Sequence, residues 1–271
     1  MIEVIHWDCL EAMKGMKDNS IDLVLTSPPY DNLRTYEDSL ERSFDIFQWI
    51  AKELSRIIKV WWIIVWIVWD ATVKGSETGT SFRQALYFKD ECLLNIHDTM
   101  IYRKTWCPFP EKTRYYPIFE YMFVLSKWPP NTHNLIADRK NIESGSRVAR
   151  KKWNRQADGS MRENSASKLG NDRKIKDTWV RYNIRRISSS STEKDKTKLL
   201  HPATFSKRLA QDHILSRSNH WDKVLDCFAW SWTTWVACKE IWRDCILIEK
   251  EKKYIDIINK RLDNTTISLF H

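Results

Sequence analysis

The chain has 271 residues and carries 44 Lys and Arg against 35 Asp and Glu, a net charge of +9. This length suits one large α/β domain with an insertion, or two small domains, and the basic balance favours a polyanionic partner. The longest apolar run (residues 60–69) is too short to span a bilayer and no signal-like segment is found, so we expect a cytoplasmic protein without a membrane segment. The six cysteines lack metal-ligand spacing, so we expect reduced, mostly buried thiols and no metal.

The first predicted strand covers residues 2–5 and leads to Asp8 and a short helix over residues 9–13. An acidic side chain at the carboxyl end of a parallel strand is well placed to accept a hydrogen bond from a ligand amine or hydroxyl. Asp8 also suits the N-cap of the helix, and the two roles are compatible.

The second predicted strand, residues 21–25, runs directly into Thr-Ser-Pro-Pro-Tyr at residues 26–30. The two prolines fix φ, remove two N–H donors and hold Ser27 extended, so the turn is stiff and its carbonyl groups point outward. The amino group of a nucleobase can donate to Ser27 and to these carbonyls while Tyr30 stacks on the base. A rigid turn without a ligand is the alternative, and we favour the functional interpretation.

Strand and helix then alternate. The apolar spacing predicts a helix over residues 43–58, a buried parallel strand over 63–69, a helix over 80–91 and a pair of strands over 95–102 and 118–126. This order predicts an open α/β sheet.

Between residues 135 and 198 the apolar periodicity disappears and Lys and Arg become dense. Basic side chains contact nucleic-acid phosphates while a few side chains read base edges. We therefore interpret this segment as a nucleic-acid-binding insertion, with a solvated basic linker as the alternative. The residues expected to contact the nucleic acid are Arg147, Arg150, Lys151 and Lys152.

The last part of the chain returns to alternating elements. We expect a helix over residues 201–216, a strand over 224–226, a helix over 233–240, a strand over 246–248 and a helix over 252–262. Glu249 ends the last strand, about 20 residues after the strand-to-helix turn that begins at Asp226, where a carboxylate accepts from ribose hydroxyls in nucleotide-binding folds.

Three of these segments resemble motifs of the DNA amino-methyltransferases, which methylate cytosine N4 or adenine N6 with S-adenosyl-L-methionine. Residues 26–30 resemble their motif IV, residues 201–205 their motif X, and residues 224–234 their motif I. The catalytic motif precedes the basic segment and the two cofactor motifs, which is the order of the permuted β group. The resemblance implies a Rossmann-like, seven-stranded α/β methyltransferase sheet with one antiparallel strand.

The same resemblance divides the chain and assigns roles to its residues. It implies a catalytic half over residues 1–134, the target-recognition insertion over 135–198 and a cofactor-binding half over 199–271. The implied catalytic residues are Ser27, Pro28, Pro29 and Tyr30. The implied cofactor-binding residues are Asp8, His201, Phe205, Asp226, Phe228, Ala229, Trp230, Ser231, Trp232, Thr233 and Glu249.

The expected activity is transfer of a methyl group to an amino group of a base flipped out of double-stranded DNA. Ser27 at the first position of motif IV favours cytosine N4, and adenine N6 is the alternative. An enzyme of this kind that acts on protein or RNA is disfavoured by the basic insertion and the motif order. A homodimer and a partner restriction endonuclease stay open.

Tryptophan stands where the resembled family has glycine. Motif I usually reads Leu-Asp-Pro-Phe-Ala-Gly-Ser-Gly-Thr-Thr, and here Trp230 and Trp232 take its two glycine positions. The chain has 15 Trp and only 6 Gly, where roughly 19 Gly are usual. We hypothesise that its source organism reads UGA as glycine and that these codons were translated as tryptophan. Genuine indoles at both positions would instead favour a non-catalytic DNA-binding relic.

Overall fold

A computed structural model describes residues 2–29, 44–105, 113–132, 134–142, 153–163, 176–187, 205–230 and 232–256. The chain divides into two compact units. The first unit comprises residues 1–134 and 183–271, and the second unit comprises residues 135–182.

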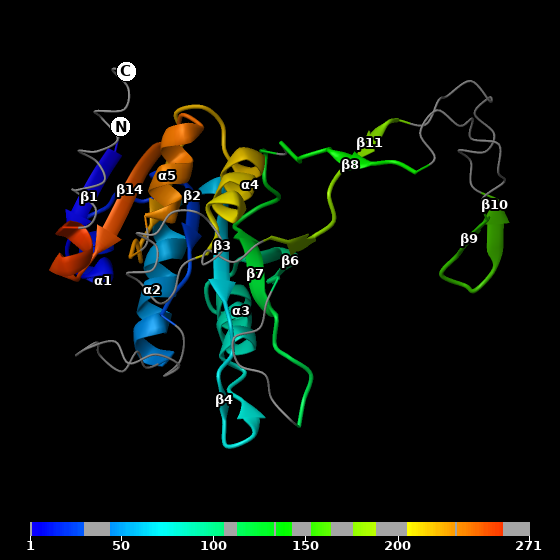
Figure 1. The fold of residues 1–271 in the computed structure, drawn as a ribbon, viewed down its shortest axis with the longest axis horizontal. Coiled ribbons are helices and arrows are strands. Elements are labelled where there is room, and N and C mark those ends of the chain that lie inside the picture. Colours follow the sequence, from blue (N-terminus) through cyan, green and yellow to red (C-terminus); the bar gives the residue numbers. More distant parts are fainter. Residues whose placement is uncertain are drawn as a thin grey trace. The chain divides into compact units, whose positions relative to one another are not determined.

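The first unit is built on an eight-stranded sheet with the strand order β1-β14-β13-β2-β3-β7-β6-β12 (Figure 1). Its strands are β1 (Ile2–His6), β2 (Ile21–Thr26), β3 (Ile58–Val68), β6 (Asn95–Arg103), β7 (Phe119–Ser126), β12 (Ile184–Arg186), β13 (Lys223–Asp226) and β14 (Asp244–Glu249). Only the pairings of β7 with β3 and β6 are antiparallel among these strands, which confirms the predicted α/β class with one antiparallel strand. The sheet has eight strands rather than seven, because β12 adds in parallel beside β6.

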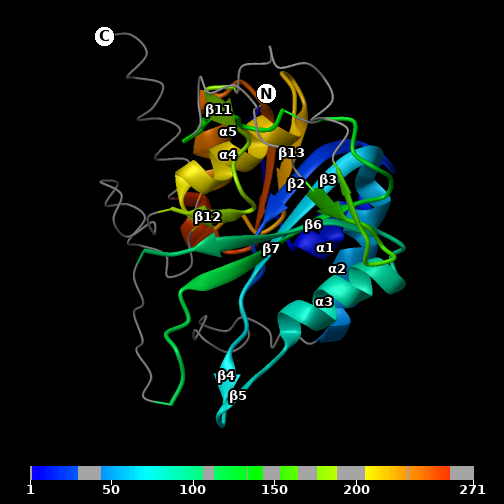
Figure 2. The ribbon, with the colours of Figure 1, turned by 90° about the vertical axis from the view of Figure 1, so that its right-hand side faces the viewer.

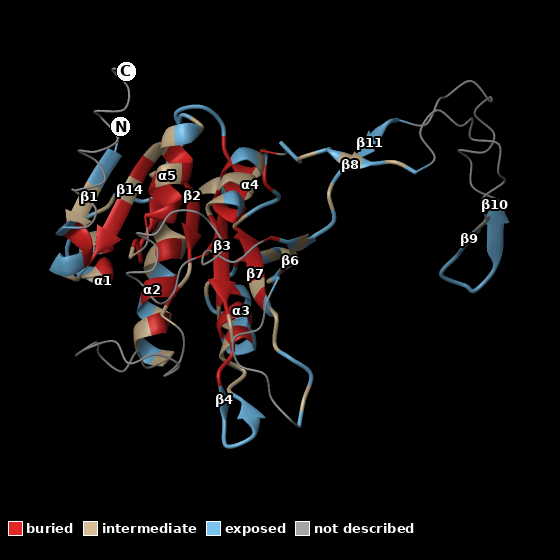
Figure 3. Cartoon of the chain, in the orientation of Figure 1, coloured by how far each residue is buried: buried red, intermediate tan, exposed pale blue. Residues whose placement is uncertain are grey.

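Helices cover both faces of this sheet (Figure 2). The helices α1 (Cys9–Lys14), α2 (Phe44–Ile57) and α3 (Thr80–Asp90) contribute to one core, and α4 (Lys207–Arg217) and α5 (Thr233–Glu240) contribute to the other. Successive strand residues point to opposite faces, so Leu23 and Leu25 of β2 enter the α4–α5 core while Val24 enters the α1–α3 core. Residues 63–68 of β3 are buried (Figure 3) and continuously apolar, which agrees with the buried strand predicted over residues 63–69.

The helix boundaries follow from local capping. The predicted helix over 201–216 begins later, at Lys207, because the Ser206 side chain accepts from the Arg208 N–H and caps the helix there. Helix α3 starts after Gly79, which has no side chain to cap it. Asp70, at the end of β3, instead accepts from the backbone N–H of Ser81 at 2.8 Å and from its hydroxyl.

The remaining elements are small. The first unit also contains a hairpin of β4 (Thr72–Val73) and β5 (Ser76–Glu77), and residues 252–256 are helical. Four of the five described cysteines are buried, as expected. No helix among the described residues is long and apolar enough to cross a membrane.

The described residues of the second unit form two antiparallel strand pairs. One joins β8 (Arg139–Lys140) to β11 (Thr178–Trp179), and the other joins β9 (Trp153–Arg155) to β10 (Met161–Glu163). Arg181 pairs with Asp138 near the first of these, and the Arg139 guanidinium lies 4.1 Å from the centre of the Tyr182 ring. None of the side chains described in this unit is buried. Residues 183–187, which the sequence prediction placed in the insertion, belong to the first unit.

Candidate active site at the carboxyl edge of the sheet

Four adjacent parallel strands, β1, β14, β13 and β2, end at the same edge of the sheet, here called the carboxyl edge (Figure 1). His6 pairs in register with Glu249, and Asp226 pairs with Leu247. The segments that follow these strands therefore meet, although they come from opposite ends of the chain. This edge holds Asp8, the turn at Ser27, the turn after Asp226, and Glu249.

Asp226 ties two of these turns together. Its carboxylate is buried and accepts from the Thr26 hydroxyl at 2.7 Å, from the Thr234 hydroxyl at 2.6 Å and from the Phe228 N–H at 3.2 Å. Burial raises the pKa of Asp226, and the bonds from Thr234 and Thr26 oppose that rise. One carboxylate thus fixes the end of β2 against the start of helix α5.

The Ser-Pro-Pro turn follows Thr26 directly. Pro28 is buried, whereas Ser27 and Pro29 are partly exposed. Tyr30, the predicted stacking residue, lies outside the described residues. The structure thus places the three described residues of the predicted catalytic turn at the carboxyl edge, next to the turn held by Asp226.

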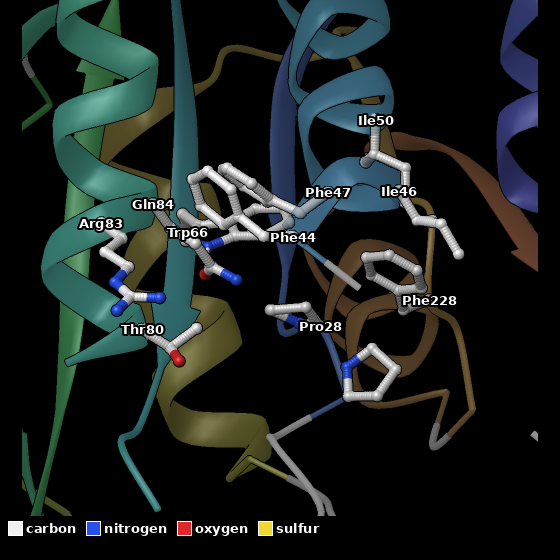
Figure 4. Close-up of a pocket in the computed structure, with 11 residues that line it drawn as sticks. Pro28, Phe44, Ile46, Phe47, Ile50, Trp66, Thr80, Arg83, Gln84 and Phe228 are labelled. Atoms are coloured by element: carbon white, nitrogen blue, oxygen red, sulfur yellow. Dashed lines mark hydrogen bonds between the residues drawn. The ribbon is translucent and has the colours of Figure 1, made fainter. Parts of the chain in front are cut away.

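A cavity of about 200 Å³ opens beside this turn (Figure 4). Its walls are mostly apolar and aromatic, and they come from the Ser-Pro-Pro turn, α2, β3, α3 and the turn after β13. The lining residues are Pro28, Pro29, Phe44, Ile46, Phe47, Ile50, Trp66, Thr80, Arg83, Gln84 and Phe228. The cavity therefore joins one predicted cofactor residue, Phe228, to the predicted catalytic prolines.

The polar side of this cavity was missed in the sequence analysis. Gln84 is buried on α3, and its amide oxygen accepts from the Trp66 indole N–H at 2.8 Å. Its amide nitrogen points toward the cavity in Figure 4. Arg83 and Thr80 stand on the same helix. A buried glutamine on the apolar face of a predicted helix is the signal that can reveal such a site.

Glu249 is a second buried acid at the carboxyl edge. Its side chain is 6% exposed, and its Oε1 accepts from the Glu251 N–H at 2.7 Å. Burial raises its pKa to about 7, because the loss of water disfavours the carboxylate more than the backbone hydrogen bonds favour it. A ligand hydroxyl that donates to this carboxylate replaces part of the missing water, so Glu249 suits a ribose.

Asp8 occupies the position predicted from its place after β1. Its carboxylate accepts from the Leu10 N–H at 3.0 Å and caps α1. The helix-cap interpretation is thus confirmed, while its predicted contact with the cofactor stays a prediction.

The turn between β13 and α5 fits a nucleotide cofactor only in part. Phe228, Ala229 and Thr233 are buried there, and Phe205 is buried in the α4–α5 core. Trp230 is partly exposed, whereas Trp232 is buried at 1% exposure with a left-handed φ of 62°. The acidic residues suit the hydroxyls of a cofactor, but the indole positions crowd a turn whose backbone has to come close to it.

Several predicted site residues lie outside the described residues. These are Tyr30, Arg147, Arg150, Lys151, Lys152, His201 and Ser231.

Comparison with known proteins gives consistent matches. The N6/N4 family model described as "DNA methylase" matches residues 21–260. The chain is 47% identical over 256 residues to the orphan methyltransferase M.BamHII of Bacillus amyloliquefaciens, covering 94% of this chain and 93% of that protein. Among solved structures, the cytosine-N4-specific PvuII DNA methyltransferase matches with a TM-score of 0.65 at 20% identity, covering 94% of this chain and 83% of that one. A complex of M1.HpyAVI with SAM matches with a TM-score of 0.59 at 21% identity, covering 97% and 100%.

Proposed function

The chain belongs to the N6/N4 DNA methylase family, and we propose that it transfers a methyl group to cytosine N4 in a specific DNA sequence. It is a DNA methyltransferase whose substrate is DNA and whose cofactor is S-adenosyl-L-methionine, which supplies an electrophilic methyl group. The observation that carries the proposal is the Asp226 carboxylate, which binds Thr26, directly before the Ser-Pro-Pro turn, and Thr234 on the cofactor side.

In this proposal Ser27 and the carbonyls of the adjacent prolines accept hydrogen bonds from the amino group of the target base. These contacts orient the nitrogen and hold its protons, so positioning supplies most of the acceleration. Tyr30 stacks on the base. Glu249 and Asp8 hold the hydroxyl and amine groups of the cofactor, and the remaining predicted cofactor residues line its binding turn.

The cavity beside Pro28 is the proposed binding site of the flipped base. Its volume of about 200 Å³ suits a single flat ring, since an engineered apolar cavity of about 150 Å³ binds benzene. Aromatic walls from Phe47, Trp66 and Phe228 supply stacking surfaces, and the Gln84 amide supplies a hydrogen-bond donor. A base inside a duplex cannot reach this cavity, so flipping is required.

Cytosine N4 is preferred to adenine N6 because serine precedes the two prolines at residue 27, the form that the sequence resemblance associates with cytosine. The test is incubation of the protein and duplex DNA with tritiated cofactor, followed by digestion to nucleosides. Label in N4-methylcytosine is the expected result. Label in N6-methyladenine would replace the proposal with its alternative.

Substitution at the turn tests the catalytic assignment. Ser27→Ala removes an acceptor next to the reacting nitrogen and should lower kcat about 100-fold, the loss typical of one positioned polar group. Ser20→Ala is the matched control, since Ser20 lies before the other end of β2 and its hydroxyl donates to the Lys17 carbonyl. Tyr30→Ala should weaken base binding about tenfold or more, because its ring no longer stacks on the base. Full activity in both Ser27→Ala and Tyr30→Ala would remove the turn from the chemistry.

The second unit is the proposed DNA-recognition module. Residues 135–182 contain 13 Lys and Arg against 6 Asp and Glu, a local charge of +7 in a chain of net charge +9. The described side chains of this unit are exposed or partly exposed, as a surface that meets phosphates requires. The sequence analysis extended this insertion to residue 198, whereas the compact second unit ends at residue 182.

Charge removal tests this module. Replacing Arg147, Arg150, Lys151 and Lys152 with glutamine should flatten the salt dependence of DNA binding, by about 0.9 in log K per log salt for each phosphate that the protein no longer neutralises. A control variant with Lys14→Gln and Lys17→Gln removes exposed charges that precede the amino end of β2, remote from the carboxyl edge. An unchanged slope in the fourfold variant would exclude these residues from the DNA surface.

The similarity to an orphan methyltransferase supports an enzyme that acts without a partner restriction endonuclease. A homodimer stays a prediction, and sedimentation of the purified protein with and without DNA tests it.

A further inference from the structure

Half of the described non-glycine residues with a left-handed backbone are tryptophan. Six non-glycine residues among those described have positive φ, and three of them are Trp221 at 69°, Trp232 at 62° and Trp242 at 58°. Tryptophan supplies 15 of the 271 residues, so chance would place about 0.3 of a tryptophan among six positions. A bulky side chain is rare in this region because its Cβ approaches the backbone too closely, whereas glycine adopts it freely.

Trp242 occupies a position that favours glycine for a specific reason. Helix α5 ends with its C-cap at Ile241, and the Arg243 N–H donates to the Cys238 carbonyl at 3.0 Å. That bond is the outer one of a Schellman motif, in which the residue after the C-cap is left-handed and usually glycine. The Trp242 side chain is 68% exposed, so packing gives no reason for an indole there.

Trp221 repeats this pattern in the turn that leads into β13. Its side chain is 70% exposed, and the Asp222 N–H on its carboxyl side donates to the Asn219 carbonyl at 3.2 Å. A tight turn with a left-handed residue and no side-chain packing is a position for glycine.

Trp232 occupies the N-cap of α5, at the cofactor-side turn. Its side chain gives the helix no cap, and its ring lies edge-on to that of Trp235, with 5.7 Å between the ring centres. The indole nitrogen of Trp235 is buried without a hydrogen-bond partner among the described residues. Burial of such a donor is unfavourable, which argues against this tryptophan pair as a native core.

Trp66 shows what a native tryptophan looks like in the same chain. It lies inside β3, its indole N–H donates to Gln84, and its ring contacts Phe47 and Phe88 at 5.8 and 5.3 Å between centres. Trp66 therefore differs from Trp221, Trp232 and Trp242, whose backbone is left-handed.

We infer that the functional protein carries glycine at positions 221, 232 and 242, through UGA codons that its source reads as glycine, and tryptophan at position 66. The identity of these residues follows from their backbone and side-chain surroundings and does not depend on the proposed function. Its consequence for the enzyme rests on the proposed function: glycine at position 232 frees the α5 N-terminus for the close approach of the cofactor.

Two measurements test the inference. The first is fragment-ion mass spectrometry, which assigns each residue by position, of tryptic peptides from protein purified from its natural source, covering residues 218–223, 224–239 and 240–243. Glycine masses at the three positions are expected. Tryptophan masses there would overturn the inference, and so would a glycine mass at position 66 in the peptide of residues 60–74. Glycine without methyl transfer would instead contradict the proposed function, so the two failures are distinguishable.

The second measurement uses recombinant protein. Trp221→Gly and Trp242→Gly should each raise Tm by about 2–4 °C, because relief of the left-handed strain exceeds the entropy that glycine adds to the unfolded chain. Trp66→Gly is the matched control and should lower Tm, since it empties a packed site and orphans Gln84. A fall in Tm in both exposed-site variants would refute the assignment.

Discussion

Replacing Glu249 with glutamine should change the stability of the protein in a manner that depends on pH. The pKa of Glu249 is raised from 4.5 to about 7 by burial, so the folded state holds its proton more tightly than the unfolded state does. Between those two values the folded state binds more protons, and the free energy of unfolding therefore falls as the pH rises. Above pH 7 this loss of stability is complete. At about 1.4 kcal/mol per pH unit, the interval from 4.5 to about 7 gives a total of about 3 kcal/mol.

Glutamine has nearly the same shape and keeps an oxygen that can accept from the Glu251 N–H, but it carries no charge at any pH. The Glu249→Gln variant should match the parent at pH 4 and exceed it by about 3 kcal/mol at pH 8. Urea unfolding of both proteins at several pH values measures this difference. A difference that stays constant between pH 4 and pH 8 would refute the burial of an ionisable Glu249.

Two further predictions concern buried hydrogen bonds. Thr26→Val and Thr234→Val each remove one hydrogen bond to the Asp226 carboxylate and should each lower the free energy of unfolding by about 1.5–3 kcal/mol. Because both bonds end on one carboxylate, the two losses should be non-additive in a double-mutant cycle. Purely additive losses would contradict this shared role. Asp70→Ala removes the acceptor of the Ser81 N–H at the start of α3 and should cost about 1–2 kcal/mol in chemical denaturation, whereas an unchanged midpoint would mean that water replaces this cap.

The carboxyl edge was predictable because it needs only strand positions. Ser27, Asp226 and Glu249 each follow or end a short apolar run, and parallel strands end at one edge of a sheet. Their side-chain surroundings were harder to predict. That Thr26 donates to Asp226 depends on a contact between segments 200 residues apart. Glu249 lies on β14, which pairs with β1 from the opposite end of the chain, so its surroundings also depend on distant segments.

The cavity was not predictable for a related reason. Phe47 and Trp66 have the spacing of ordinary core residues, and apolar periodicity does not distinguish a side chain that fills a core from one that lines a cavity. The late start of α4 had a local signal in Ser206, a favoured N-cap residue that the sequence analysis did not use. The eighth strand, β12, was hidden within a basic, weakly apolar segment.

The strand order of the sheet also determines how much of the chain must be synthesised before the sheet can be completed. Strand β1 pairs only with β14 among the described strands, and the central strand β2 pairs on one side with β13. A nascent chain emerging from the ribosome therefore carries residues 2–6 without a neighbouring strand until residues 244–249 have been made. Such distant pairings are slow to form and leave strand edges open in the meantime. Methyl transfer should consequently be absent from every nascent chain that stops short of β14, even though the proposed catalytic turn is among the first segments to be translated.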